Sequence, residues 1–224
     1  MELNTWVESL SGTVRLIILR GSHLDVPGAS SLRFSYLTTR LLLQRIQLEV
    51  DKQAYGTQDQ RLMNRYLQAR RTAEDILIMT QELQPQQFGD FWLSTSAFSY
   101  PDTVNFLLRC ALETEISPAA LVQSASFRLA RDLVDTLRSH QEKHSWNVGD
   151  VCLVQHADIV DKILESVSSQ DSQALGDSHG SNAGGNSNGA GPGFDVQDLM
   201  LSDASIIDQF FPSLWDPLQL QNPW

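Results

Sequence analysis

One feature constrains the fold of this chain more than any other. Between residues 31 and 167, large apolar side chains recur at steps of three and four. The clearest run is Leu62, Tyr66, Ala69, Ala73, Ile76 and Leu83. This spacing places its members on one face of an α-helix about six turns long. No strand-like alternation competes with it, so the sequence predicts an all-α domain over residues 31–167.

Turn residues set the expected helix boundaries. The expected helix starts are Ser31, Gly56–Thr57, Pro101 at a first helical position, Ser117–Pro118 as N-cap and first residue, and Asn147 or Asp150. The helix over 31–51 is crowded with Leu and Ile, which predicts burial on most sides. The helix after Pro118 is expected to run to about His140. Residues 1–30 are weakly defined, with 16–19 either helix or strand and 21–30 a loop.

The end of the chain has a different composition. Residues 168–193 are rich in Ser, Gly and Asn, which predicts a flexible linker. Residues 194–224 then place five aspartates among bulky apolar side chains, without any Lys or Arg. Such interleaving is typical of an acidic activation segment. The expected partner-binding residues are Leu199, Met200, Ile207, Phe210, Phe211, Leu214 and Trp215. The alternative is that this apolar tail docks on the chain's own helical core.

The acidity of the chain is concentrated toward its end. The net charge is -11, and eight acidic residues follow Lys162, the last basic residue. Residues 1–162 therefore carry only about -3. This balance argues against direct nucleic-acid contact, which depends on clustered Lys and Arg. The apolar run at 14–20 is too short and too charged to span a membrane, and the two cysteines are expected to be reduced and buried, as in an intracellular protein.

Two histidines raise the question of a metal site. His140 and His144 have the i, i+4 spacing of a zinc-binding helix, but Glu142 is displaced by one position from the H-E-x-x-H order. We expect a polar helix end with both histidines exposed.

Other candidate sites are weaker. Cys152 and His156 share a helix face and Cys110 could lie nearby, but buried thiols are the simpler expectation. The glycine-rich stretch 184–193 lacks the ending of a phosphate loop. No nucleophile and base are paired by any motif. We therefore expect no enzyme activity, no cofactor and no metal in this chain.

Three stretches carry a family resemblance. They contain the Phe91–Trp92 pair followed by Ser-Ala-Phe at 96–98, then Leu-Leu-Arg-Cys-Ala-Leu-Glu at 107–113, and Trp-Asn-Val-Gly-Asp-Val-Cys-Leu at 146–153. These resemble the regulatory domain, or middle homology region, of fungal zinc-cluster transcription factors, particularly the cutinase-factor-like branch. The resemblance covers about residues 31–168. It implies an all-α fold, a nuclear location and a role in transcription regulation.

The cysteine count departs from that family. Its members usually bind DNA through six cysteines that hold two zinc ions, whereas this chain has two cysteines. The chain is then either part of a longer factor or a protein that has lost DNA binding.

Three functions follow as hypotheses. In the first, the helical domain regulates the tail or forms homo- or heterodimers, and the tail recruits a coactivator or the transcription machinery. In the second, a helical interaction module inhibits full-length relatives by heterodimerising through the Leu62–Leu83 stripe. In the third, the helical bundle holds a small molecule as a sensor or enzyme.

Overall fold

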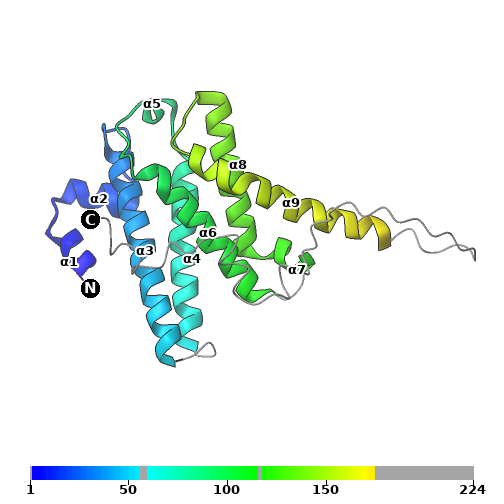
Figure 1. Cartoon of the computed structure of the whole chain (residues 1–224). Coiled ribbons are helices and arrows are strands. Elements are labelled where there is room, and N and C mark those ends of the chain that lie inside the picture. The colour runs from blue at the N-terminus through cyan, green and yellow to red at the C-terminus, as the bar shows by residue number, and fades with distance from the viewer. Residues whose placement is uncertain (1, 56–59, 116–117, 175–224) are drawn as a thin grey trace, which may run out of the picture.

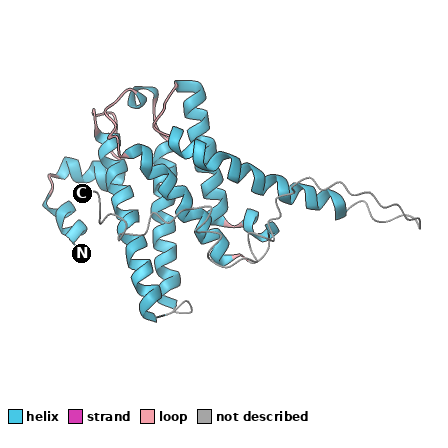
Figure 2. Ribbon diagram, in the orientation of Figure 1, coloured by secondary structure: helices cyan, strands magenta, loops and turns pink. Residues whose placement is uncertain are grey.

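The computed structural model describes residues 2–55, 60–115 and 118–174, and their regular elements are α-helices (Figures 1 and 2). The helices are α1 Glu2–Ser9, α2 Gly12–Arg20, α3 Ala29–Tyr55, α4 Gln60–Gln81, α5 Pro85–Phe88, α6 Ser96–Thr114, α7 Pro118–Gln123, α8 Ala125–His144 and α9 Asp150–Ala174. No strand occurs in these ranges, which confirms the all-α prediction. The starts expected at Gly56–Thr57 and Ser117, and residues 175–224, lie outside them.

The long helices form a bundle. α3 and α4 run antiparallel as a hairpin, and α6 packs on both of them (Figure 1). α8 packs on α4 and α6, and α9 packs across α6 and α8 before its end projects away from the bundle (Figure 1). The Leu62–Leu83 stripe of α4 faces inward, where Ala69, Ala73 and Ile76 are fully buried. The apolar period of α4 therefore identified its packed face.

The outer face of α3 corrects one prediction. The sequence predicted a helix buried on most sides, but Leu42, Leu43, Ile46 and Val50 are between 42 and 52 % exposed. Core contacts come instead from Phe34 and from leucines on the opposite side of the helix. α2, α4 and α6 pack on α3, and the four aliphatic side chains stay exposed beside these contacts.

The prediction that Pro101 opens a helix was wrong. α6 begins five residues earlier, at Ser96, so that the proline lies inside the first turns. A proline there removes one backbone hydrogen bond of the helix. The turn that precedes it carries Tyr100, whose side chain is completely buried, and this packing accounts for the longer helix.

The helix expected from Pro118 to His140 is two helices. α7 ends at Gln123, and Ser124 begins α8 in an extended conformation. The Ser124 hydroxyl accepts a hydrogen bond of 3.1 Å from the backbone N–H of Phe127. This N-cap ends one helix and starts the next. The last helix begins at Asp150, one of the two starts predicted.

Residues 2–20, ambiguous in the sequence, form α1 and α2. Ile17 and Ile18 are buried against the bundle. The Arg33 guanidinium on α3 donates to the carbonyls of both residues, at 3.3 and 3.1 Å. Gly21 ends α2 with a positive φ of 66°, and a Cβ at this position would lie 3.0 Å from Arg33. A glycine is thus required for Arg33 to reach the end of α2.

An aromatic cluster joins α3, α5, α6 and α8. Its members are Phe34, Phe88, Trp92, Tyr100, His140, His144 and Trp146. The rings of Trp92 and Trp146 meet edge to face at 5.2 Å between centroids. Trp146 is reached through Ser145, whose positive φ of 53° ends α8 and turns the chain back. Aromatic pairs of this geometry add specific stabilisation to the area that they bury.

No helix in the described part of the chain is long and apolar enough to cross a membrane.

Candidate functional site: interaction surfaces of the helical domain

A groove of about 330 Å³ lies between α3 and the first turns of α6. Its apolar wall includes Phe34, Leu41, Leu42 and Leu93. Its polar wall is rich in hydroxyl groups and contains one guanidinium and one carboxylate, from Arg45 and Asp102. No histidine lines the groove, so its serines have no neighbouring imidazole to act as a base. The lining suits binding through hydrogen bonds and ion pairing.

Arg45 and Asp102 form the charged centre of this groove. The Arg45 guanidinium donates to the backbone carbonyl of Asp102 at 3.3 Å. Burial lowers the pKa of Arg45 and raises that of Asp102, while each charge partly offsets the effect on the other. The pair is therefore held in a partly desolvated setting, where its charges act more strongly than at an open surface.

Ser96 adds an unsatisfied polar group to the lining. Its side chain is 2 % exposed, and its Oγ has no hydrogen-bond partner among the described residues. Buried hydroxyls are usually hydrogen-bonded, so this atom departs from the common pattern.

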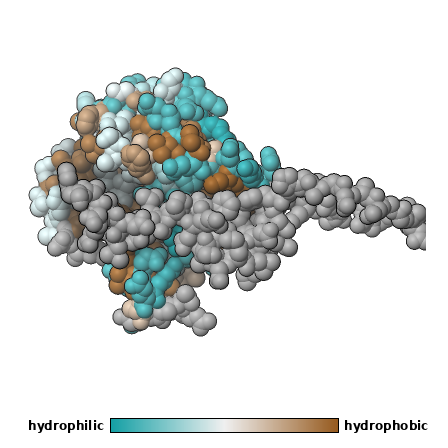
Figure 3. Space-filling view, in the orientation of Figure 1, coloured by the Kyte–Doolittle hydropathy of each residue, from teal (hydrophilic) through white to brown (hydrophobic). Residues whose placement is uncertain are grey.

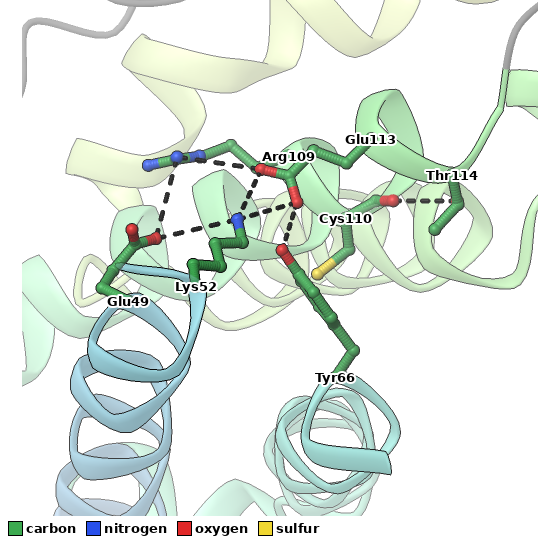
Figure 4. A network of polar contacts seen from close by, with 7 residues as sticks. All are labelled: Glu49, Lys52, Tyr66, Arg109, Cys110, Glu113 and Thr114. Atoms are coloured by element: carbon green, nitrogen blue, oxygen red, sulfur yellow. Dashed lines mark hydrogen bonds and ion pairs between the residues drawn. The ribbon is translucent and has the colours of Figure 1, made fainter. Parts of the chain in front are cut away.

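A second, smaller hollow continues from Arg45 along α3 and α6. Figure 4 shows its polar network, which is centred on Glu113 of α6. The Lys52 ammonium lies 3.0 Å from the Glu113 carboxylate, Arg109 lies 3.8 Å from it, and the Tyr66 hydroxyl donates to it. Glu49 stands 3.9 Å from both cations. The network thus ties α3, α4 and α6 together through one carboxylate.

Burial favours the protonated forms of two groups at this network, Cys110 and Tyr66. Cys110 is buried, and desolvation raises the pKa of its thiol to about 12. Desolvation and the hydrogen bond to Glu113 also raise the pKa of Tyr66. A protonated thiol is a poor nucleophile, so Cys110 is a core residue, as predicted. The network connects three helices, and both of these groups are held in their protonated forms.

Exposed apolar side chains make the outer face of α3 a candidate surface. We call Leu42, Leu43, Ile46 and Val50 the α3 stripe; it borders the groove at Leu42. Figure 3 shows other apolar regions, in brown, lying among polar ones over the helical domain. The solvent-facing side of a helix normally carries polar residues. Four large aliphatic groups in three turns are therefore suited to contact with another molecule or segment.

The outer face of α4 mixes apolar and basic groups. Met63 and Leu67 are 50 and 36 % exposed, and Arg70 and Arg71 follow one turn later. We call these four residues the α4 patch. Met63 and Leu67 were missed because they fall outside the core stripe, although their four-residue spacing is visible in the sequence.

The two histidines at the end of α8 belong to the aromatic cluster. His140 bonds to the Thr80 carbonyl at 2.8 Å, and Phe88 stacks on the exposed His144 at 4.5 Å. The prediction that both are exposed was wrong for His140, which is half-buried. Desolvation lowers its pKa. The nearby aromatic residues Phe88 and Trp146 were the available signal, but only the fold brings them to α8.

His156 and Cys152 are both buried on α9. One ring nitrogen of His156 bonds to the Asn105 side chain at 2.8 Å, and the other faces the Cys152 carbonyl at 3.2 Å. Burial lowers the pKa of His156 and raises that of Cys152 to about 12. The described residues contain no group of three or more His, Cys, Asp or Glu side chains able to hold a metal ion.

The predicted activation residues lie outside the described part of the chain. They are Leu199, Met200, Ile207, Phe210, Phe211, Leu214 and Trp215. The expected linker lies outside it as well from residue 175 onward, whereas residues 168–174 form the end of α9.

Comparison of the chain with protein-family models, with curated proteins and with solved structures finds no match. The zinc-cluster resemblance therefore stays a prediction that depends on the quoted residues.

Proposed function

We propose that this chain is the regulatory and activating part of a transcription regulator that acts in the nucleus. The tail would recruit a coactivator or the transcription machinery, and the helical domain would control it. The observation that carries the proposal is the tail itself, with five aspartates among large apolar residues and no basic residue after Lys162. The acids keep the apolar groups soluble until a partner with an apolar groove binds them.

The helical domain supports this role through its surfaces. It offers exposed apolar faces on α3 and α4 and a groove with a charged centre. Its thiols and the ring of His156 are buried and held by core contacts. These features suit a module that binds other molecules. The resemblance to the zinc-cluster regulatory domain gives independent support.

Reporter activation by residues 168–224 joined to an unrelated DNA-binding domain tests the proposal. We expect activation, and we expect its loss when Phe210, Phe211 and Trp215 are changed to Ala, because these side chains supply the binding energy. A matched control changes Ser202 and Ser205 to Ala and should activate like the unaltered tail. Activation by the triple variant at the level of the unaltered tail would refute the role of the tail.

An inhibitory interaction module is the second candidate. The surface that the sequence suggested for it, the Leu62–Leu83 stripe, lies in the core and is unavailable. The α3 stripe is exposed and favours a contact with a second copy or a relative. Light scattering of the full chain at tens of micromolar would test this. A dimer that Ile46→Ser and Val50→Ser convert to a monomer supports it, and a monomer throughout contradicts it.

A further inference from the structure

The α4 patch combines apolar and basic side chains on one helix face, where Met63, Leu67 and Arg71 are exposed and Arg70 is partly buried. Met63 and Leu67 are four positions apart, and Arg70 and Arg71 lie one turn further on. Residues three and four apart share a helix face, so the four side chains form one continuous surface. Residues 60–73 contain no acid, and Glu74 is the first that follows. The first half of α4 is thus apolar and positively charged on its outer side.

The two arginines of the patch have no ionic partner in the described part of the chain. Arg65, on the same helix, pairs with Asp51 of α3 and is thereby occupied. No described carboxylate lies within ion-pair distance of Arg70 or Arg71. A ligand that brings carboxylates beside apolar groups would complement both halves of this surface.

This chain contains a segment with that chemistry. In residues 194–224, Asp203 and Asp208 flank apolar side chains, and no positive charge opposes them. Ile207, Phe210 and Phe211 follow the i, i+3, i+4 spacing that would present one apolar face if a helical turn formed on binding. Pro212 limits the length of such a turn. The segment needs a partner with a short apolar surface and basic groups beside it. The α4 patch has both, since Met63 and Leu67 span about one turn and Arg70 and Arg71 follow them.

The chain between the end of α9 and the acidic tail is long enough to span the whole of α9. α9 has 25 residues and is roughly 38 Å long. The 19 residues from 175 to 193 can span at most roughly 65 Å. The tail can therefore return along the whole of α9 to the bundle. A tether of this length also gives an effective concentration on the order of millimolar, so even a weak contact would be populated.

We propose that residues 194–216 dock on the α4 patch of the same molecule. The aspartates pair with Arg70 and Arg71, and the apolar residues cover Met63 and Leu67. The regulatory consequence rests on the proposed function: while docked, the activation residues are withheld from a coactivator. The docking itself requires only the contact and can be tested without any transcription assay.

Hydrogen exchange read by mass spectrometry on the full chain tests the contact. An exposed ion pair changes an equilibrium by a factor of roughly 1.5 to 5. The double variant Arg70→Glu and Arg71→Glu should therefore speed exchange in 194–216 about tenfold, while exchange in α8 is unchanged. The opposite change, Glu74→Arg, adds a positive charge to the same face and should slow exchange in the tail. Asp203→Arg with Asp208→Arg should restore protection to the double variant.

Three results would overturn the proposal. The first is exchange in the tail of the unaltered chain as fast as in a free peptide, and the second is unchanged exchange in the Arg70 and Arg71 variant. The third is protection that rises with protein concentration, which would assign the contact to a second copy. A reporter arm separates this proposal from the proposed function. If the tail alone fails to activate while its protection responds to the variants, the docking stands and the activation role falls.

Discussion

Replacing Glu113 by Gln should destabilise the helical domain, because one carboxylate joins three helices at this point. Its oxygens accept from Lys52 at 3.0 Å and from the Tyr66 hydroxyl, and Arg109 lies at 3.8 Å. Glutamine keeps the size and one acceptor, so the phenol retains a neutral partner. The substitution then removes one close ion pair and weakens one charge-assisted hydrogen bond.

The magnitude follows from exposure and distance. A hydrogen bond to a charged group is worth about 1.5–3 kcal/mol, about twice that of a neutral one. An exposed ion pair contributes about 0.2–1 kcal/mol. Because the Glu113 side chain is 36 % exposed, we take the lower half of both ranges and expect a loss of about 1–2 kcal/mol. Glu49→Gln is the matched control, since both its cation contacts are 3.9 Å long, and it should cost below about 0.5 kcal/mol.

Urea unfolding followed by circular dichroism at 222 nm measures both variants. The midpoint should shift for Glu113→Gln without a change in slope, and the melting temperature should fall by about 3–6 °C. A double-mutant cycle with Tyr66→Phe should show a coupling energy above about 0.5 kcal/mol. If Glu113→Gln and Glu49→Gln lowered the free energy of unfolding by the same amount, the reasoning would be refuted, because Glu113 would then stabilise the domain no more than Glu49 does.

Three further outcomes are expected. Gly149→Ala should lower the unfolding free energy measured in urea by about 1–3 kcal/mol, because the new Cβ would lie 2.9 Å from a Leu137 methyl group. Gly89→Ala is the control: its Cβ would have nothing within 4 Å, and it should change the unfolding free energy by less than about 0.5 kcal/mol. Burial lowers the pKa of His156, so the unfolded state binds more protons than the folded state below pH 6.5. As the pH is lowered from 7.5 to 5.5, this residue should therefore reduce the unfolding free energy by up to about 1.4 kcal/mol. His156→Gln should flatten the dependence of unfolding free energy on pH, and an unchanged dependence would contradict the assignment. The two buried thiols should react with a disulfide reagent at pH 8 on the order of a hundredfold more slowly in the folded chain than in urea, and equal rates would show that they are accessible.

Local spacing predicted the helices better than it predicted what covers them. The four-three steps of α4 identified its buried face because that pattern is a property of one helix. The exposure of Leu43 and Val50 on α3 depends on which helices pack nearby, and no local pattern contains that information. The same limit applies to His140, whose aromatic neighbours come from elsewhere in the chain. At Pro101, the packing of the preceding turn outweighed the usual preference of proline for a helix start.

Some candidate surfaces could be predicted from local spacing, and others depend on how the helices pack. Met63 and Leu67 could be found from their spacing once the core face of α4 was known. The groove at Arg45 and Asp102 could not, because the two residues are 57 positions apart and meet only when α6 packs on α3. The H-E-x-x-H zinc motif could be excluded from the sequence alone, because it is defined by the order and spacing of its residues.

The edge-to-face contact between Trp92 and Trp146 gives the domain an intrinsic spectroscopic probe of its folded state. Two indoles with centroids 5.2 Å apart are close enough for their transitions to couple, and the Trp146 ring is almost wholly shielded from water. Together they should give a near-ultraviolet dichroism signal and a blue-shifted emission that exist only while α5, α6 and α8 are assembled. Trp6 is exposed on α1, and Trp215 and Trp224 belong to the acidic tail, so their fluorescence can be removed by Trp→Phe substitution without touching this pair. With those three tryptophans replaced, the packing of the bundle can be followed in an unlabelled molecule.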